Sequence, residues 1–401
     1  MTRFPIDYVN KTVSLRFRGV ESSFHLSHGL FSSFSIDAGT RLLLKSIAAR
    51  VDLARIQTVL DEGCGVGVIG IAIARAAPQA RVFLQDRDAL AVAFARENCK
   101  VNGVENADLD CGLAFRGLSG RTFDLIASNL PAKAGKPVLE SFFRAVPGLL
   151  SRTGTAAVVI VSPLADLAKD AILSSGCLLF HVERTSQHVV FHFQLPEGHE
   201  SPVQLIEDLS PYLRTRQKFT AAGVEYELET AYNLADFDTA GYAVELAQDI
   251  LAASKVRGRA LYWNPGQGHL PVFAQKRAGA TISGIALAGR DALELAITER
   301  NLESAGAGAL ETHLISDEAG LQEAVEPGSV DFFCALPHPV PKAPWHGDLV
   351  NSALRLLRPG GTFLTAAEST EVFRILSHCR RLTMVESRKR LGYRAVLLRV
   401  S

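Results

Sequence analysis

Hydrophobic positions along the first half of the chain alternate between short apolar runs and longer segments with apolar residues at helical spacing. The pattern predicts strands, with helices between them, in this order: strands 57–60, 81–84, 123–127 and 156–161; helices 68–77, 89–101 and 137–150. Near-continuous apolar strands separated by helices are typical of a parallel sheet covered on both faces. Alternating segments at 189–194 and 393–400 predict antiparallel edge strands, and 12–18 with 22–26 predict a hairpin. The expected fold class is therefore α/β.

The second half of the chain repeats the first. At an offset of 203 residues Gly63 and Gly65 align with Gly266 and Gly268, and Asn98 aligns with Asn301. Nearer the end of each copy the offset is 207, which aligns Asp124 with Asp331. Before the glycines it is 201, which aligns Asp37 with Asp238. A nearly constant offset over this length indicates a duplicated domain. We predict one domain over 1–200 and a second over 204–401, joined by the turn-rich segment 195–203.

The charge balance and the cysteine spacing limit which nucleic-acid and metal partners the chain can have. The chain has 42 Lys and Arg against 42 Asp and Glu, so a general nucleic-acid footprint is absent. Any RNA contact must come from local basic runs such as 214–218, 255–259 and 388–390, although short basic runs are usually solvated surface. The six cysteines are scattered without a CxxC pair, which indicates reduced thiols rather than a metal site.

The localisation expected from the sequence is cytoplasmic. No uninterrupted apolar stretch approaches 18 residues, and the N-terminal residues lack the apolar core of a secretory signal. We therefore expect no membrane partner.

The segment from Asp61 to Gly67, DEGCGVG, follows a predicted strand and opens a predicted helix. Glycines there let the backbone turn tightly and approach a ligand. The spacing also contains GxGxxG, so a dinucleotide site is a rival interpretation. Asp61, two residues before Gly63, can face a ligand ammonium, and Asp86 at the end of the next strand can accept ribose hydroxyls. An ammonium partner favours S-adenosylmethionine over a dinucleotide.

Around this turn the sequence resembles the methyltransferase small domain family. The similarity runs through GLFS, IDAGT, VLDEGCGVGVIGIAIA, LQDRDALAVAFARENCKVNGV and FDLIASNLP, over most of residues 20–165. Tandem members of the family are ribosomal RNA guanine-N2 methyltransferases. The resemblance implies two tandem Rossmann-like class I methyltransferase domains, each with a mostly parallel sheet and an antiparallel edge hairpin. It also implies an S-adenosylmethionine site formed by Asp61, Gly63, Cys64, Gly65, Gly67, Asp86 and Asn129.

The same resemblance indicates the acceptor site. Asn129 and Pro131 match the family's Asn-Pro-Pro-aromatic motif and are the catalytic candidates. An amide oxygen and a backbone carbonyl hold an exocyclic amine in line with the sulfonium methyl, so positioning does most of the catalysis. Leu130 and Ala132 depart from the motif, and Ala132 removes the ring that would stack on a flipped base. A ring such as Phe31 or Phe34 is an alternative stacking partner.

Three further assignments stay open on the sequence alone. In the family an acidic residue lies near the adenine, and here Asp110 and Cys111 are the candidates at that place. Asp37 and Thr40 either cap the following helix or contact the cofactor. Lys133 and Lys136 either meet phosphate or face water.

The second copy is expected to be degenerate. At the offset of 203, Asp61 becomes Asn264, Gly67 becomes Leu270 and Asp86 becomes Gly289, and the segment CALPH lacks the acceptor Asn. A role in recognition or support follows. In tandem family members the degenerate half usually comes first, whereas here it comes second.

The leading interpretation is an S-adenosylmethionine-dependent methyltransferase acting on an exocyclic amine of an RNA base, of the ribosomal guanine-N2 type. Methylation of a protein amide or a small molecule is the second interpretation. A non-catalytic protein that binds RNA or a partner is the third. A nicotinamide oxidoreductase ranks last, because no Tyr-x-x-x-Lys relay accompanies the turn.

Overall fold

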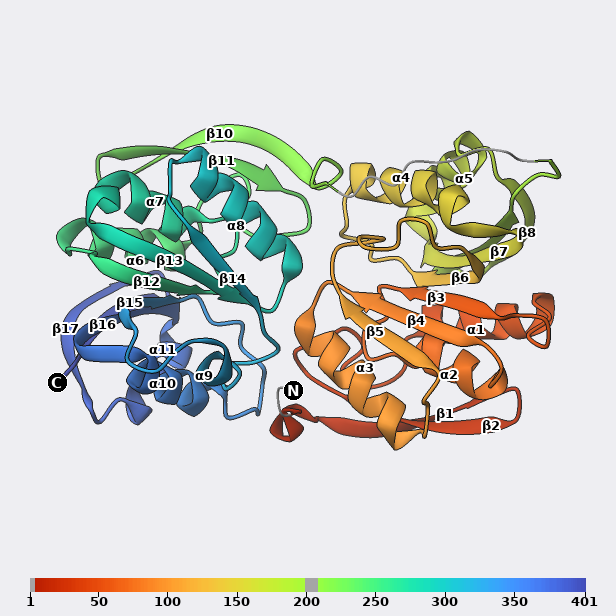
Figure 1. Ribbon diagram of the computed structural model, residues 1–401, viewed down its shortest axis with the longest axis horizontal. Helices are drawn as coiled ribbons and strands as arrows, with labels where there is room; N and C mark the ends of the chain where they lie inside the picture. The colour runs from red at the N-terminus through yellow and green to blue at the C-terminus, as the bar shows by residue number, and fades with distance from the viewer. Residues whose placement is uncertain (1–3, 199–207) are drawn as a thin grey trace. The chain divides into compact units, whose positions relative to one another are not determined.

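The computed structural model describes residues 4–198 and 208–401. The chain separates into two compact units, which we call the first unit (Val9–Tyr212) and the second unit (Leu213–Ser401 with residues 4–8) (Figure 1). Residues 4–8 group with the second unit because Tyr8 is buried there and its hydroxyl donates to Oε2 of Glu318 at 2.6 Å. Most of the predicted linker, residues 199–203, and the predicted start at 204 lie outside the described residues.

The first unit contains a seven-stranded sheet in the order β5-β4-β3-β6-β7-β9-β8. Its strands are β3 (Thr58–Glu62), β4 (Arg81–Asp86), β5 (Ala107–Cys111), β6 (Phe123–Asn129), β7 (Leu150–Val161), β8 (Leu178–Arg184) and β9 (His188–Gln194). The first five strands in this order are parallel to one another. Strand β9 is antiparallel to β7, and β8 is antiparallel to β9. This confirms the predicted α/β class, with a mostly parallel sheet and an antiparallel edge hairpin.

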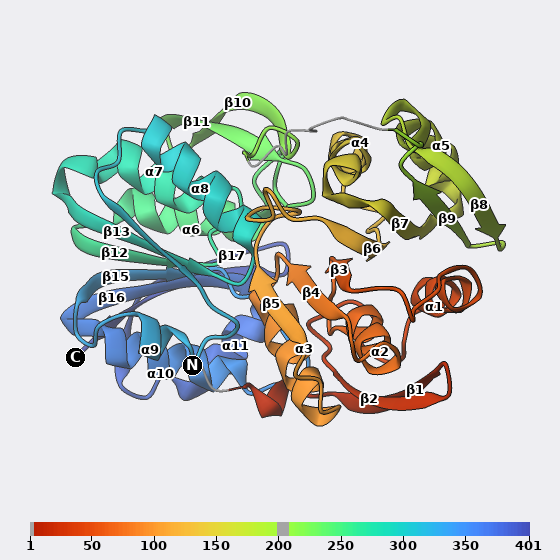
Figure 2. The same ribbon diagram turned by 45° about the vertical axis from the view of Figure 1, so that its right-hand side comes forward.

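Helices cover both faces of this sheet (Figures 1 and 2). One face carries α1 (Ala38–Arg50), α2 (Val68–Ala76) and α3 (Ala89–Val101), and the other carries α4 (Lys136–Ala145) and α5 (Ala165–Ser174). Because both faces are covered, the central strands are almost wholly apolar and buried, as Leu60, Ile126 and Val158 illustrate. The last residues of these strands are therefore the positions where polar side chains can serve a ligand.

One predicted helix is shorter than expected. The helix predicted over 137–150 ends at Ala145, and a 3-10 turn, η2 (Val146–Leu149), follows it. Pro147 is the physical reason, because proline has no N–H to donate and its ring clashes with the preceding turn of an α-helix.

The second unit repeats the architecture with a sheet in the corresponding order, β14-β13-β12-β15-β16-β18-β17. Its strands are β12 (Gly258–Trp263), β13 (Ile282–Gly289), β14 (Leu310–Leu314), β15 (Val330–Ala335), β16 (Leu357–Glu368), β17 (Leu382–Arg390) and β18 (Tyr393–Val400). Its helices are α6 (Tyr242–Ala253), α7 (His269–Ala278), α8 (Ala292–Ser304), α9 (Leu321–Ala324), α10 (Trp345–Leu356) and α11 (Ser369–His378).

Each unit also has a two-stranded hairpin outside its large sheet, β1 (Lys11–Phe17) with β2 (Val20–Leu26) and β10 (Leu213–Ala221) with β11 (Val224–Ala231). Both hairpins turn through two residues with positive φ, which is the backbone of a type I′ turn. One buried asparagine ties each hairpin to its unit. Asn98 accepts from the backbone of β2 and donates to Val66, and Asn301 accepts from the backbone of β11 and donates to Gln267.

Candidate active site

The first unit's candidate site lies where the strand order reverses, between β3 and β6. In open α/β sheets the loops diverge at such a point and leave room for a ligand beyond the carboxyl ends of the strands. Asp61 and Glu62 are the last residues of β3, and Asn129 is the last residue of β6. The fold therefore brings the predicted cofactor turn and the predicted acceptor residue to adjacent strand ends.

The glycine turn joins β3 to α2 in a conformation that requires glycine. Gly63, Gly65 and Gly67 have φ of +71°, +55° and +86°. A Cβ on Gly63 or Gly65 would meet no protein atom within 4 Å, whereas one on Gly67 would lie 2.9 Å from Cδ1 of Ile71. The first two glycines therefore leave open space for a ligand, and Gly67 allows α2 to start against the sheet.

Asp61 is fully buried beneath this turn. Its Oδ2 accepts a hydrogen bond from the backbone of Gly70 at 2.7 Å, and its Oδ1 has no partner among the described residues. Burial raises the pKa of Asp61 to about 7. A buried carboxyl group with one unsatisfied oxygen fits a ligand ammonium, which supplies both the missing donor and the compensating charge. The amino-acid portion of S-adenosylmethionine carries such a group.

Asp86 ends β4 beside the turn. Its Oδ2 accepts from the backbone of Gly65 at 2.8 Å, and its Oδ1 accepts from the backbone of Asp88 at 2.9 Å. Burial raises the pKa of Asp86 to about 6. Each carboxylate oxygen keeps a further lone pair, so the two together can accept from a pair of ribose hydroxyls.

The remaining cofactor candidates differ in their surroundings. Cys111 pairs with Asp86 in the β4–β5 register, whereas Asp110 alternates to the other face, where it accepts from Nε2 of Gln85 at 3.3 Å. Cys64 is buried within the turn, and burial together with the nearby Asp86 raises the pKa of its thiol well above the usual value. It is therefore a neutral packing group, not a thiolate nucleophile.

Asn129 is held by the start of helix α1. Its Nδ2 donates to Oδ2 of Asp37 at 3.0 Å and to Oγ1 of Thr40 at 3.0 Å. The same oxygen of Asp37 accepts from the backbone of Gly39 at 2.8 Å, so Asp37 is the N-cap residue of α1. The capping interpretation of Asp37 is confirmed, and the contact between these two residues and Asn129 is one that the sequence did not predict.

Pro131, the second catalytic candidate, already uses its backbone carbonyl for a hydrogen bond within the chain. Its carbonyl accepts from the backbone of Ala134 at 3.1 Å, and the residue is exposed. Leu130 is buried in the core, and its N–H donates to Val159 at 3.0 Å. Among the described residues no donor reaches the carbonyl of Leu130, next to Asn129, so this carbonyl can accept a hydrogen bond from a ligand. Ala132 is exposed and presents no ring.

Sequence reasoning missed Glu62. This residue is buried, its Oε2 has no partner in the described parts of the chain, and burial raises its pKa well above the usual value. Ser128 donates to the backbone carbonyl of Glu62 at 2.7 Å and joins the ends of β3 and β6. The available signal was an acidic residue at the end of an apolar strand, but the role of a ligand-facing acid was assigned to its neighbour Asp61 alone.

The second unit corrects the predicted alignment of the turns. Gly268 has φ of +92°, begins α7 and donates to Pro265, just as Gly67 begins α2 and donates to Cys64. Gly67 therefore corresponds to Gly268, and the prediction that Leu270 replaces it is wrong. The offset is 201 in the turn and 203 from β13 onward, because the connection after α7 has two additional residues.

With the corrected alignment, Tyr262 replaces Asp61 and Asn264 replaces Gly63. The predicted replacement of Asp86 by Gly289 holds, since both end the second strand of their sheets, and Leu336 takes the place of Asn129. Asp238 is not the counterpart of Asp37. It pairs with Arg214, whereas the N-cap residue of α6 is Gly241.

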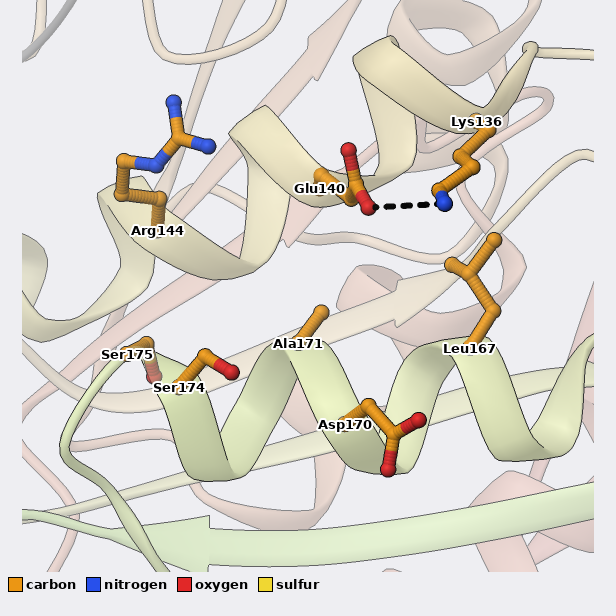
Figure 3. A pocket seen from close by; sticks show the side chains of 8 residues that line it. All are labelled: Lys136, Glu140, Arg144, Leu167, Asp170, Ala171, Ser174 and Ser175. Carbon is orange, nitrogen blue, oxygen red and sulfur yellow. Dashed lines mark ion pairs between the residues drawn. The ribbon is translucent and has the colours of Figure 1, made fainter.

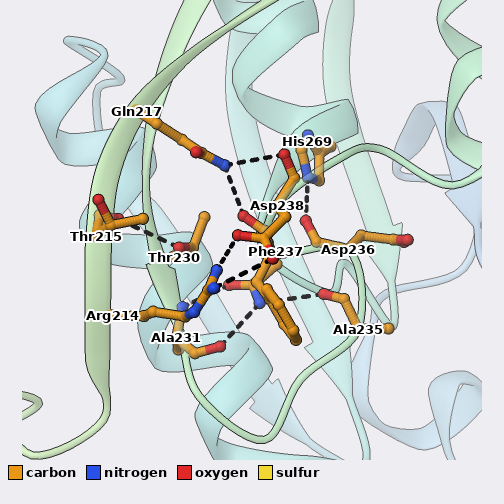
Figure 4. Close-up of polar contacts among 11 residues, drawn as sticks. Arg214, Thr215, Gln217, Thr230, Ala231, Ala235, Asp236, Phe237, Asp238 and His269 are labelled. Atoms are coloured by element: carbon orange, nitrogen blue, oxygen red, sulfur yellow. Dashed lines mark hydrogen bonds and ion pairs between the residues drawn. The ribbon is translucent and has the colours of Figure 1, made fainter.

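Side chains at the second turn hydrogen-bond to the end of β11 and the loop that follows it (Figure 4). Gln267 donates to the carbonyls of Ala231 and Ala235, both at 3.1 Å, and His269 Nε2 contacts the carbonyl of Asp236 at 2.8 Å. Burial lowers the pKa of His269 to about 4, so the ring is neutral. The corresponding first-unit residues are Val66 and Val68, which have no side-chain donors.

The basic runs considered for RNA contact are largely paired within the second unit. The ion pairs are Arg214–Asp238, Arg216–Glu227, Lys218–Glu225, Arg259–Glu311, Arg388–Glu386 and Arg390–Glu245. Pairing of this kind favours the interpretation of these runs as solvated surface.

Lys136 lines a groove of about 440 Å³ between α4 and α5 (Figure 3). Its Nζ lies 3.6 Å from Oε1 of Glu140, so its charge is partly neutralised. The groove also holds Arg144 and Asp170, and this mixture of charges gives no preference for phosphate.

Within the described residues no cluster of three or more His, Cys, Asp or Glu side chains is arranged to hold a metal ion. Nor does that part of the chain contain a helix both long and apolar enough to cross a membrane.

The strand order, the glycine turn at the switch point and the acidic side chains around it define a Rossmann-like, S-adenosylmethionine-dependent methyltransferase domain. Residues 21–174, all within the first unit, match the model of the methyltransferase small domain family. The uncharacterised protein YbxB of Bacillus subtilis is 32% identical over 152 residues, which cover 37% of this chain and 74% of YbxB. The chain belongs to the methyltransferase small domain family.

Other relatives extend this relationship. The ribosomal RNA small subunit methyltransferase C of Haemophilus influenzae is 35% identical over 124 residues, 31% of this chain and 35% of the relative. The match thus spans about a third of that protein. The solved structure of the T. thermophilus 16S rRNA N2 G1207 methyltransferase (RsmC), in complex with AdoMet and guanosine, covers 98% of this chain and is itself covered to 99%, with a TM-score of 0.66 at 16% identity. That likeness confirms the tandem fold over both units.

Proposed function

We propose that the first unit methylates an exocyclic amine of an RNA base, of the ribosomal guanine-N2 type, with S-adenosylmethionine as donor. The observation that carries this proposal is the fixed amide of Asn129 at the strand end next to Asp61. Relatives named as ribosomal RNA methyltransferases, and the fold shared with a structure that contains guanosine, support the choice of substrate. An RNA substrate of this kind implies a cytoplasmic enzyme.

In this mechanism the chain mainly orients the two reactants. Asp61 would hold the ammonium of the cofactor and Asp86 its ribose, and Gly63 and Gly65 leave space for it. The cofactor supplies an electrophilic methyl group on a sulfonium. Asn129 Oδ1 and the Leu130 carbonyl accept hydrogen bonds from the substrate amine and direct its lone pair at that methyl. With the cofactor bound, its sulfonium would give up the methyl group to the amine nitrogen, and the amine would release one proton to water.

A stacking ring must come from outside the acceptor motif, because Ala132 has none. Phe31 and Phe34 are 75% and 65% exposed and lie on the segment that leads into Asp37. Phe34 rests edge-on against His28, with ring centroids 5.0 Å apart. Exposed rings near a base-binding site provide stacking worth about 1–3 kcal/mol per base. We therefore assign base stacking to this segment.

The substrate can be tested by mass spectrometry of RNA nucleosides from cells with and without the gene. Loss of one methylated guanosine, restored by the wild-type gene, is the expected result. If every RNA nucleoside is unchanged, the alternative acceptors, a protein amide or a small molecule, take precedence. The changes at Leu130 and Ala132 and the paired basic runs are the observations that favour those alternatives.

The catalytic role of Asn129 can be tested with Asn129→Ala. Turnover should fall by about 100-fold, because one preorganised contact to the reacting group is lost, while the affinity for S-adenosylhomocysteine stays nearly constant. Single-turnover methylation and thermal melts measure the two effects separately. Unchanged methylation by a well-folded variant would remove Asn129 from the mechanism.

A further inference from the structure

We propose that Asp37 and Thr40 are positioning residues that hold the Asn129 amide with its oxygen toward the methyl acceptor. This inference rests on the proposed function for the acceptor role of Asn129. The hydrogen bonds themselves are independent of it.

Chemistry fixes which end of the amide faces α1. A carboxylate can only accept hydrogen bonds, so the group 3.0 Å from Oδ2 of Asp37 must be the NH2 of Asn129. Thr40 Oγ1, also at 3.0 Å, accepts the second hydrogen. Both amide hydrogens are then used, and Oδ1 is turned away from α1. An amide rotated by 180° would place its oxygen against a carboxylate and lose the bond to Asp37.

The anchor for this amide is rigid. The Asp37 oxygen that binds Asn129 also accepts from the backbone of Gly39 at 2.8 Å and of Thr40 at 3.2 Å, which fixes it to the first turn of α1. Helix α1 is in turn held by Leu43 and Ile47, both 0% exposed. Space at the anchor is tight, because a Cβ on Gly39 would lie 2.8 Å from the same carboxylate oxygen.

The second unit has no counterpart of the side chains of Asp37, Thr40 and Asn129. When α6 is aligned with α1 by its N-cap and its buried face, Gly241 and Val244 occupy the places of Asp37 and Thr40. Leu336 occupies the place of Asn129. A merely structural tether between helix and strand would still be useful in a unit that keeps the fold. Its absence where the acceptor amide is absent ties the two residues to that amide.

The test separates positioning from stability. Thr40→Val keeps the shape of a residue that is 8% exposed and removes the hydroxyl, and Asp37→Ser keeps an N-cap oxygen that is too short to reach Asn129. Both should lower kcat by roughly tenfold or more with little change in KM for either substrate. Thr40→Ser, which keeps the hydroxyl, should recover most of the turnover. Ile47→Val serves as the matched control, because it destabilises α1 without touching the amide and should leave kcat per folded molecule unchanged.

Hydrogen exchange of the Asn129 carboxamide, assigned with Asn129→Ala and followed by NMR, makes the result independent of the substrate. Slow exchange in the wild type and fast exchange in Thr40→Val are expected. A wild type that methylates no RNA but shows this protection would contradict the proposed function and leave the orientation intact. If Thr40→Val and Asp37→Ser turn over normally, or if kcat falls only in proportion to the folded fraction, the positioning role is wrong.

Discussion

The two glycine turns of this chain share a backbone and differ in the side chains around it. In both units a left-handed glycine starts the helix, and the first residue after the strand donates to the neighbouring strand. In the first unit the acids Asp61 and Asp86 lie beside the turn, whereas Tyr262 and Gly289 replace them in the second. The backbone turn therefore survives without the groups that fit the cofactor, and the side chains decide whether a ligand site exists.

The largest expected difference is in cofactor binding. Gly65→Leu puts a side chain into the open space of the first turn and strains a backbone with φ of +55°, so S-adenosylhomocysteine affinity should fall by at least about 100-fold. Gly266→Leu is the matched control, since its φ is +60° and its Cβ would also meet nothing. Isothermal titration should give one site per chain, lost only in the first variant. Two sites, or equal losses in both variants, would abolish the distinction between the units.

The units should also separate functionally. A fragment comprising Val9–Tyr212 contains its own sheet and hairpin and should fold alone. We expect it to bind S-adenosylhomocysteine as the full chain does and to lose most turnover if the second unit recognises the substrate. Circular dichroism, titration and a methylation assay on the native substrate provide the comparison. Full activity of the fragment would contradict a recognition role for the second unit.

Binding should depend on pH through Asp61. The pKa of Asp61 in the folded chain is about 7, above the ordinary 3.8. The Asp61 carboxyl group of the free protein is therefore protonated over much of the acid range, and a ligand ammonium must displace that proton in order to bind. Affinity for S-adenosylhomocysteine should drop about tenfold from pH 8 to pH 6. Titrations in buffers of different ionisation enthalpy should detect proton release near pH 7. Asp61→Asn should bind weakly at every pH, and a pH profile that survives this change would assign the proton to another group.

The smallest expected effect concerns Glu62. Because burial raises its pKa above the unfolded value of 4.5, the folded state binds more protons than the unfolded state above that pH. Its carboxyl group therefore lowers stability progressively as pH rises from about 4.5. Glu62→Gln should raise the free energy of unfolding by about 1 kcal/mol at pH 8 and by less at pH 5. Urea melts at both pH values measure this, with the exposed Glu105→Gln as control. Equal changes at both pH values would mean that charge is not the cause.

The sequence by itself determined the fold class, the duplication and the cofactor turn. These features depend on local patterns: apolar strands, helical spacing, and glycines directly after a strand. Helix α3 and strand β18 were predicted with their observed bounds for this reason. The acceptor Asn129 was also found locally, as the last residue of a strand.

Only the tertiary structure decided how these parts meet. The contact of Asp37 and Thr40 with Asn129 joins residues about 90 positions apart, and no local pattern encodes it. The alignment of the second turn needed the register of β12 with β13, because two additional residues after α7 shift the offset without changing the backbone turn. The state of Glu62 likewise depends on its burial, and some basic residues pair with partners distant in the chain, as Arg259 does with Glu311 and Arg390 with Glu245. Short-range propensity sets the elements, whereas solvent exclusion and long-range packing set the chemistry of their ends.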